Sequence, residues 1–170
     1  ADMADAWRDG AERYDGFDVP FSTACVGVIE GGVYDNIVPE DCRFHYEFRN
    51  LPGSDALAMQ QRVLDAATQL ERPMKAIDAA TGFRFEDICA VPSFLANESD
   101  EAVALAQRLS GQQRTTLVAF GTEAGHFHRA GISTVVCGPG HIDQAHQPDE
   151  FVSLEQLALC ENFLRRLAKP

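Results

Sequence analysis

The chain has 170 residues, and its 45% hydrophobic content predicts a globular fold with a buried core rather than a disordered chain. Its 26 acidic residues outnumber its 14 basic residues and give a formal charge of −12. This charge disfavours nucleic acid and anionic membranes as partners, and no apolar run approaches the length of a membrane span.

The cysteines indicate the redox environment that we expect for the protein. They are five in number, widely spaced, and mostly embedded in apolar runs: Cys25, Cys42, Cys89, Cys137 and Cys160. An odd count without Cys-x-x-Cys pairs is typical of reduced, buried thiols. We therefore expect a cytoplasmic protein without disulfides.

In chain order, the first half of the sequence predicts a helix, two strands, a second helix and a third strand. Apolar residues at helical spacing indicate a helix within 1–14. The apolar run 21–30 predicts a strand, and 42–49 predicts a clearer one because apolar and polar residues alternate. An apolar stripe predicts a helix over 56–70, with a proline after it, and 83–91 predicts a further strand. Since no crossover helix separates the first two strands, we expect an antiparallel sheet covered by helices.

The second half of the sequence predicts alternating helices and strands. Helices are expected at 97–111, at 123–130 and, after a capping box, at 153–167. The apolar runs 115–120 and 132–137 predict buried strands between them. Two parallel strands leave both faces and both edges without partners, so we expect this α/β layer to be incomplete by itself.

A loop between the last predicted strand and the last helix contains two histidines. It reads GPGHIDQAHQPDE, over 138–150, and places His141 and His146 five residues apart. Histidines in loops after strands often bind zinc, with a carboxylate holding the second ring nitrogen. A surface histidine is the commoner case, however, and this spacing is not that of a helical zinc motif. From these residues alone, both interpretations remain open.

Several linked motifs resemble those of the zinc-dependent amidohydrolase and peptidase family that includes the acetylornithine deacetylases. They are VGVIEGGVYDNIVPEDC at 26–42, YEFRNLPG at 46–53, GTEAGHF at 121–127, GISTVVCGPG at 131–140 and QAHQPDEFV at 144–152. The match covers most of the chain, in order. The Glu-Ala that follows Gly-Thr resembles the acetylornithine deacetylase branch, because the desuccinylase and carboxypeptidase branches usually have Ser-Asp there.

The resemblance implies a mixed fold of α+β and α/β parts. Residues 1–92 are expected to form a ferredoxin-like lid, or dimerisation domain, with an antiparallel sheet, helices on one face and its first strand missing. Residues 93–170 are expected to form the C-terminal segment of an α/β zinc-peptidase-like catalytic domain whose N-terminal half is absent. The family's His-x-Asp motif, bridging aspartate and Glu-Glu pair do not occur here, so we expect no catalytic residue in this chain and no turnover by it alone.

The resemblance also implies one metal ligand. His146, in the family's Ala-His-x-Pro-Asp-Glu pattern, corresponds to a ligand, whereas His141 falls at a position that the family fills with a small polar residue. Glu150 is expected either to hold His146 or to be a solvated acid before the last helix.

Five further residues correspond to the family's substrate contacts. Arg49 matches the arginine that grips the substrate carboxylate, and Asn36 matches an asparagine that reaches a substrate in the opposite subunit. Gly121 and Thr122 are expected to present a backbone group and a hydroxyl to the substrate at the end of a strand. Glu123 is expected to pair with the side-chain ammonium of ornithine.

Ordinary structural roles compete with some of these assignments. Arg49 also suits a surface ion pair with Glu47 or a cross-strand acid, and Asn36 suits a turn after the two glycines. We expect His126 and His128, near the start of a short helix, to be structural or exposed.

For the full-length protein, the resemblance implies hydrolysis of N-acetyl-L-ornithine to ornithine and acetate in arginine biosynthesis. It implies a small N-acetylated amino acid as substrate, two divalent metal ions per subunit, zinc or cobalt, and a homodimer formed through the lid. A metal-bound hydroxide would attack the acetyl carbonyl, with a glutamate outside this chain moving the proton. The alternatives are a related N-acyl-amino-acid amidohydrolase, desuccinylase or dipeptidase, and a non-catalytic dimerisation module.

Overall fold

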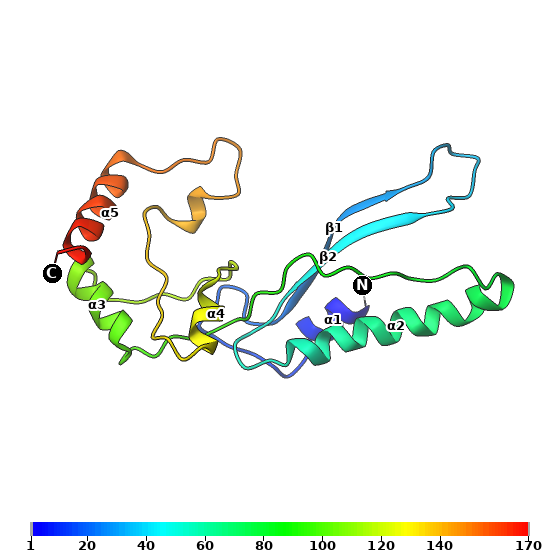
Figure 1. Ribbon diagram of the computed structural model, residues 1–170, viewed down its shortest axis with the longest axis horizontal. Helices are drawn as coiled ribbons and strands as arrows, with labels where there is room; N and C mark the ends of the chain where they lie inside the picture. The colour runs from blue at the N-terminus through cyan, green and yellow to red at the C-terminus, as the bar shows by residue number, and fades with distance from the viewer. Residues whose placement is uncertain (1, 170) are drawn as a thin grey trace. The chain divides into compact units, whose positions relative to one another are not determined.

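The computed structural model describes residues 2–169, which divide into two compact units (Figure 1). Unit 1 comprises the chain up to Ser93 together with Val118–Phe120, and unit 2 comprises Phe94–Leu117 and the chain from Gly121 onward. The elements of unit 1 are α1 (Asp2–Arg8), β1 (Thr23–Gly31), β2 (Cys42–Arg49) and α2 (Ala56–Ile77). Those of unit 2 are α3 (Glu101–Ser110), α4 (Ala124–Arg129), the 3-10 helix η1 (Ile142–Gln144) and α5 (Leu154–Leu167).

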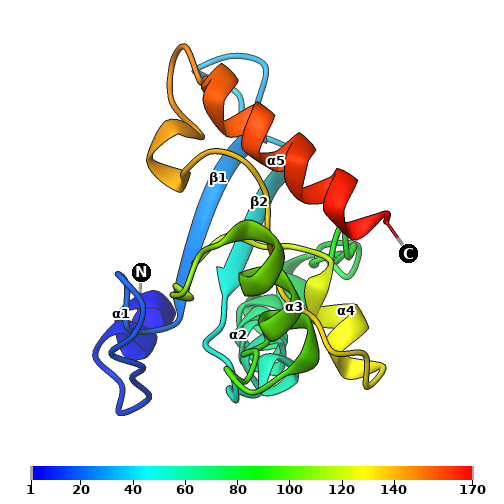
Figure 2. The ribbon, with the colours of Figure 1, turned by 90° about the vertical axis from the view of Figure 1, so that its left-hand side faces the viewer.

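The strands β1 and β2 form an antiparallel hairpin and run side by side in both views (Figures 1 and 2). This confirms the predicted antiparallel pairing. The register begins with Thr23 opposite Arg49 and shifts between Val26 and Val28, where Gly27 is the extra residue of a bulge. Within residues 2–169 the hairpin is the only sheet.

The alternation predicted for β2 is present at the end of the strand that leads to α2. Tyr46 and Phe48 are half-buried, whereas Glu47 and Arg49 are exposed. The ring of Phe48 packs edge-on against Trp7 of α1, with ring centroids 5.9 Å apart. Burial also raises the pKa of the Tyr46 hydroxyl. One row of β2 side chains therefore faces the small core of unit 1.

The side chains of that core come from α1, from the chain after β2 and from α2. Its buried apolar side chains are Trp7, Leu51, Met59 and Ala67, of which the last two belong to the stripe predicted for α2. The hydroxyl of Ser22, which is 5% exposed, accepts the backbone N–H of Leu51 at 3.2 Å. This bond satisfies a buried donor beside the apolar cluster.

Helix α2 is longer than its predicted core of 56–70. Asp55 caps its start by accepting the Ala58 N–H at 3.0 Å. The helix then continues through Pro73 to Ile77 instead of ending before the proline. Proline removes the hydrogen bond to the carbonyl four residues earlier, and that carbonyl belongs to Gln69, an exposed residue that water can reach.

The chain after α2 turns back onto the helix through Glu71. This carboxylate accepts the backbone N–H of Phe83 at 2.6 Å and pairs with Lys75 at 2.5 Å. Gly82, at a φ of +158°, allows the close approach, because a Cβ there would lie 2.9 Å from Glu71 Oε1. The Lys75 bond, followed by the Phe83 N–H, holds the pKa of Glu71 below its usual value.

The Glu71 contact is expected to weaken in acid. A carboxyl whose pKa is lower in the folded than in the unfolded state contributes stability above the unfolded pKa of about 4.3, and that contribution is lost as pH falls through the folded pKa. The protection of the Phe83 amide against hydrogen exchange, corrected for the intrinsic rate, should therefore decline below about pH 4. Glu71→Gln should remove this dependence and Glu86→Gln should keep it; the same pH dependence in Glu71→Gln as in the unsubstituted chain would refute the assignment.

Three predicted strands, 83–91, 115–120 and 132–137, are absent, which corrects those predictions. Their apolar runs lie in irregular chain, because strand structure requires a partner to pair backbone N–H and C=O groups. The helix predicted within 1–14 also ends early, at Arg8. The findings thus support a mixed α/β chain with a two-stranded antiparallel sheet.

The helices of unit 2 begin and end near their predicted residues. Helix α3 ends at Gly111, which has a left-handed φ of +80°. Helix α5 begins after Ser153, whose side chain accepts the Gln156 N–H at 3.2 Å. The Gln156 side chain accepts the Gly140 N–H at 3.4 Å, so only half of the predicted capping box forms.

Helices α3 and α5 are joined at their C-terminal ends. Arg166 of α5 donates to the carbonyls of Arg108 at 3.1 Å and Leu109 at 2.5 Å, near the end of α3. A cation at this position satisfies free carbonyls and complements the helix dipole. Val103 of α3, 1% exposed, is the most deeply buried large side chain described in either unit.

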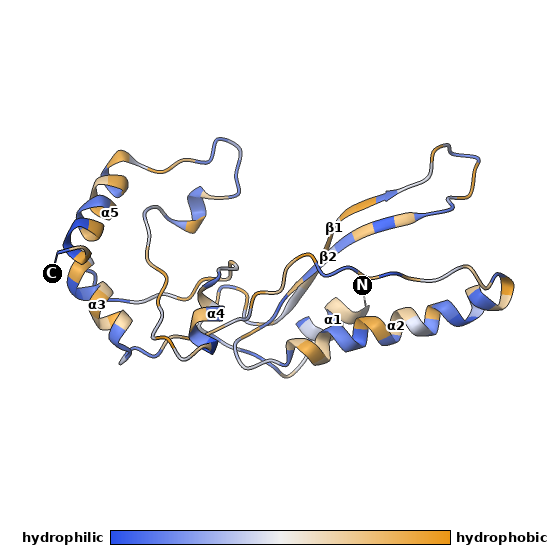
Figure 3. Ribbon diagram, in the orientation of Figure 1, coloured by the Kyte–Doolittle hydropathy of each residue, from blue (hydrophilic) through white to orange (hydrophobic). Residues whose placement is uncertain are grey.

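Much apolar surface remains exposed, contrary to the prediction of a well-buried core. Figure 3 shows apolar residues along the hairpin and on α5, and Ile29 and Leu154 are 70% and 84% exposed. The cysteines are free, but four are exposed and Cys160 is half-buried, so their predicted burial is wrong. No helix within residues 2–169 is both long and apolar enough to cross a membrane.

Candidate functional site

The loop before α5 holds His146 in an unusual backbone conformation. His146 and Asp149 have φ values of +58° and +60°, which residues with a side chain rarely adopt. The carboxylate of Glu150 accepts the His146 N–H at 2.8 Å, and the Glu150 N–H donates to the Gln147 carbonyl at 3.2 Å. The two bonds close a tight loop. Left-handed residues of this kind cluster at functional sites, where the surrounding structure stabilises them.

Glu150 therefore contacts His146, but through the main chain. The carboxylate does not bond the imidazole ring of His146, and this residue is exposed. Glu150 therefore holds the backbone from which the His146 ring projects. It does not determine which nitrogen of the ring carries the proton.

His141 has a local structural role in the same loop. Its Nδ1 accepts the Asp143 N–H at 3.3 Å, and its own N–H donates to the Gln144 side chain at 2.8 Å. Together these bonds cap the short helix η1. His126 is exposed, and the half-buried ring of His128 lies 5.4 Å from that of Phe94.

The residues described here do not fit a complete metal site. Within residues 2–169, no three side chains of histidine, cysteine, aspartate or glutamate lie close enough together to hold one ion. Structural zinc sites use four such donors and catalytic ones use three. His146 is a single exposed imidazole, which is one potential donor and not a site.

Arg49, at the end of β2, already has two partners within unit 1. Its Nε pairs with Glu47 at 3.1 Å, and its Nη1 donates to the carbonyl of Ala119 at 3.1 Å. The side chain is 52% exposed, so its outer edge remains open to solvent. The ordinary alternative, an ion pair with Glu47, is thus present in the structure.

The stretch Gly121–Glu123 leads into α4. The Thr122 hydroxyl accepts the Ala124 N–H at 3.1 Å and so satisfies one of the free donors at the start of the helix. Glu123 is exposed and makes no side-chain capping bond. Since 115–120 is not a strand, Gly121 and Thr122 do not stand at the end of one, which corrects that part of the prediction.

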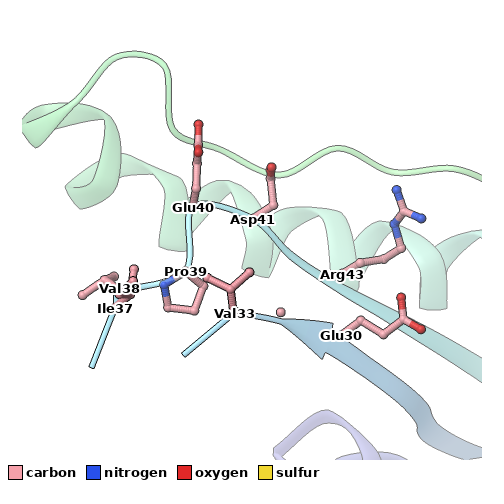
Figure 4. Close-up of a pocket in the computed structure, with 10 residues that line it drawn as sticks. Glu30, Val33, Ile37, Val38, Pro39, Glu40, Asp41 and Arg43 are labelled. Atoms are coloured by element: carbon pink, nitrogen blue, oxygen red, sulfur yellow. The ribbon is translucent and has the colours of Figure 1, made fainter. Parts of the chain in front are cut away.

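Asn36 lies in the turn at the tip of the hairpin, where the Ile37 N–H donates to the Tyr34 carbonyl at 3.4 Å. The exposed position agrees with turn chemistry. An open hollow adjoins the turn; its lining includes Val33 and Pro39 and the cross-strand pair Glu30 and Arg43 (Figure 4).

The structure leaves the predicted site residues in separate places. In unit 1, Arg49 lies at one end of the hairpin and Asn36 at the other. In unit 2, no hydrogen bond or ion pair between described residues links Thr122 or Glu123 to His146. The contact between Arg49 and Ala119 was not predicted, because 70 residues separate the two in sequence.

Comparison with known proteins gives consistent matches. The model of peptidase family M20/M25/M40 matches residues 3–169. An acetylornithine deacetylase of Myxococcus xanthus is 36% identical over 152 residues, which are 89% of this chain and 39% of that protein. Those of Aliivibrio salmonicida and Pasteurella multocida are 31% and 30% identical over 89% of this chain, and the matches cover 39% and 38% of their lengths. The chain thus spans less than two fifths of these relatives.

Proposed function

We propose, because this chain belongs to peptidase family M20/M25/M40, that it is part of a hydrolase that removes the acetyl group from N-acetyl-L-ornithine. The observation that carries the proposal is the 36% identity to an acetylornithine deacetylase over 89% of the chain. The GTEAGHF motif at 121–127 supports the same branch. The product, ornithine, would place the complete enzyme in arginine biosynthesis.

Five residues would contact the substrate. The outer edge of the Arg49 guanidinium is open to solvent and can donate to a carboxylate. The exposed carboxylate of Glu123 is free of capping bonds and suits the ammonium of ornithine. Gly121 and Thr122 precede it directly and would contact the same substrate, and Asn36 at the hairpin tip would reach a substrate held by a second subunit.

His146 would supply one imidazole to a divalent metal ion, zinc or cobalt, in the complete enzyme. The hydrogen bond from the His146 N–H to the Glu150 carboxylate supports this role, because it fixes a strained, left-handed backbone that an ordinary surface histidine does not need. Residues 2–169 hold no complete set of donors, so the remaining ligands and the general base would come from the part of the polypeptide that this chain does not contain.

Residues 1–92, which make up most of unit 1, would serve as the lid or dimerisation domain. In the two-stranded sheet, β1 and β2 each have one edge without a strand partner among the described residues. Val26, Val28 and Ile29 of β1 are between 43% and 70% exposed. Both features favour a homodimer through this unit. They also favour the second candidate function, a non-catalytic association module, for this chain by itself.

The substrate assignment is testable through Glu123. In the complete enzyme, Glu123→Gln is expected to lower kcat/KM for N-acetyl-L-ornithine about tenfold, because a charge-assisted bond to the ammonium is lost. The value for N-acetyl-L-norvaline, which has no side-chain ammonium, should change less than about twofold.

The unsubstituted enzyme, assayed on the same compounds and on a succinylated amino acid and a dipeptide, is the reference for this test. A preference for the succinylated compound or the dipeptide would support another member of the family. Equal losses on both acetylated substrates would remove the proposed role of Glu123.

A further inference from the structure

The chain passes between the two units at sites that both contact the end of β2. The chain leaves unit 1 for the first time after Ser93. It later returns to unit 1 for the short run Val118–Phe120. Each of these two passages is fastened by one side chain of a consecutive pair, Arg49 and Asn50.

Asn50 fastens the first passage. Its Nδ2 donates to the Ser93 hydroxyl at 2.8 Å and to the Leu51 carbonyl at 3.2 Å. The Ser93 hydroxyl in turn donates to the same Leu51 carbonyl at 3.3 Å. Leu51 is 8% exposed and is itself bonded through its N–H to buried Ser22, so the three groups are fixed to the core of unit 1.

Arg49 fastens the second passage. Its Nη1 donates to the Ala119 carbonyl, while the bond from Nε to Glu47 holds the plane of the guanidinium. Val118 and Ala119 are exposed and Phe120 is half-buried, and the run belongs to no helix or strand. The hydrogen bond from Arg49 is therefore one of the contacts that hold this irregular run against unit 1. Gly121 follows two residues after Ala119.

We propose that Arg49 and Asn50 are positioning residues that hold the two inter-unit passages independently, Arg49 at Ala119 and Asn50 at Ser93. The stretch Gly121–Glu123 follows directly in sequence on the run that Arg49 holds. If Arg49 also binds the substrate carboxylate, which rests on the proposed function, the substrate and the Ala119 carbonyl compete for one guanidinium.

Limited proteolysis of this chain tests the proposal without any assay of hydrolysis. Chymotrypsin cleaves after aromatic residues, and Phe94 and Phe120 mark the two passages. Cleavage in the folded state follows local opening, so its rate at each site, assigned by mass spectrometry, reports how firmly that passage is held.

The expected result is a crossed pattern. Arg49→Met should accelerate cleavage after Phe120 by about threefold to tenfold and leave Phe94 unchanged, because one charge-assisted hydrogen bond is lost. Asn50→Ala should accelerate cleavage after Phe94 by a similar factor and leave Phe120 unchanged. Arg49→Lys, which keeps a cationic donor, should restore part of the protection at Phe120.

Two further variants make the result decisive. Ser93→Ala removes the partner of Asn50 and should reproduce the effect of Asn50→Ala at Phe94. Arg84→Met removes a 96% exposed arginine of unit 1 and should change neither site. Unchanged cleavage in the Arg49 and Asn50 variants, or equal acceleration at both sites in each with the far-UV circular dichroism retained, would overturn the proposal.

Discussion

Replacing His146 with asparagine in the complete enzyme is expected to lower kcat/KM for N-acetyl-L-ornithine by at least about a hundredfold. Loss of a group that merely orients a metal ligand typically costs 10–100-fold in metal affinity or activity, so loss of a ligand should cost more. Asparagine tolerates the left-handed conformation that His146 has, with a φ of +58°, so the loop should keep its shape. Metal content, measured by mass spectrometry after dialysis, should fall together with activity.

The same substitution at His141 is the matched control. Asparagine can still accept the Asp143 N–H that His141 Nδ1 accepts, so η1 should remain capped. Activity should then change by less than about twofold. If the two variants behave alike, or if the His146 variant retains its metal and its activity, His146 is not a ligand and the assignment of this loop fails.

The largest effect on stability is expected at Trp7. This side chain is 9% exposed and packs against Phe48, with the Arg62 guanidinium 6.0 Å from its ring. Trp7→Ala should lower the free energy of unfolding of unit 1 by about 3–5 kcal/mol, because it removes the largest member of a small core. Urea unfolding followed by circular dichroism at 222 nm measures the change without depending on tryptophan fluorescence.

Trp7→Phe should cost far less. The buried Trp7 Nε1 has no hydrogen-bond partner among the described residues, so phenylalanine removes an unsatisfied donor while it keeps an aromatic ring against Phe48. Tyr34→Ala, at a 73% exposed position, is the control and should stay within about 0.5 kcal/mol of the unsubstituted chain. A loss below about 1 kcal/mol in the alanine variant would mean that this cluster is not the core of unit 1.

The elements that the sequence predicted correctly depend on local signals. The alternation in β2, the serine before α5 and the glycine after α3 act within a few residues, and the structure confirms all three elements. The three absent strands were predicted from apolar runs alone. Such a run is the same whether or not a partner strand lies beside it, so pairing is not a property of the run itself.

The family was predictable because several motifs occur in order along the chain, and the match over residues 3–169 confirms it. The arrangement of the site was less predictable. The hydrogen bond from the His146 N–H to Glu150 depends on two left-handed residues that are not glycines, His146 and Asp149. Histidine and aspartate adopt this conformation more often than most residues, but still rarely, so the sequence alone does not predict it. The contact between Arg49 and Ala119 forms only when the tertiary fold brings two distant segments together, and no local sequence pattern indicates it.

Gly27 determines which side chains meet at the tip of the hairpin. Because it stands outside the ladder, Ile29 lies opposite Phe44 and Glu30 lies opposite Arg43. If Gly27 were instead paired with His45, each outer residue of β1 would slide by one position, and Ile29 would face the arginine. The one-residue bulge thus restores the register of the outer strand, so that an apolar residue lies opposite an apolar one and an acid opposite a base.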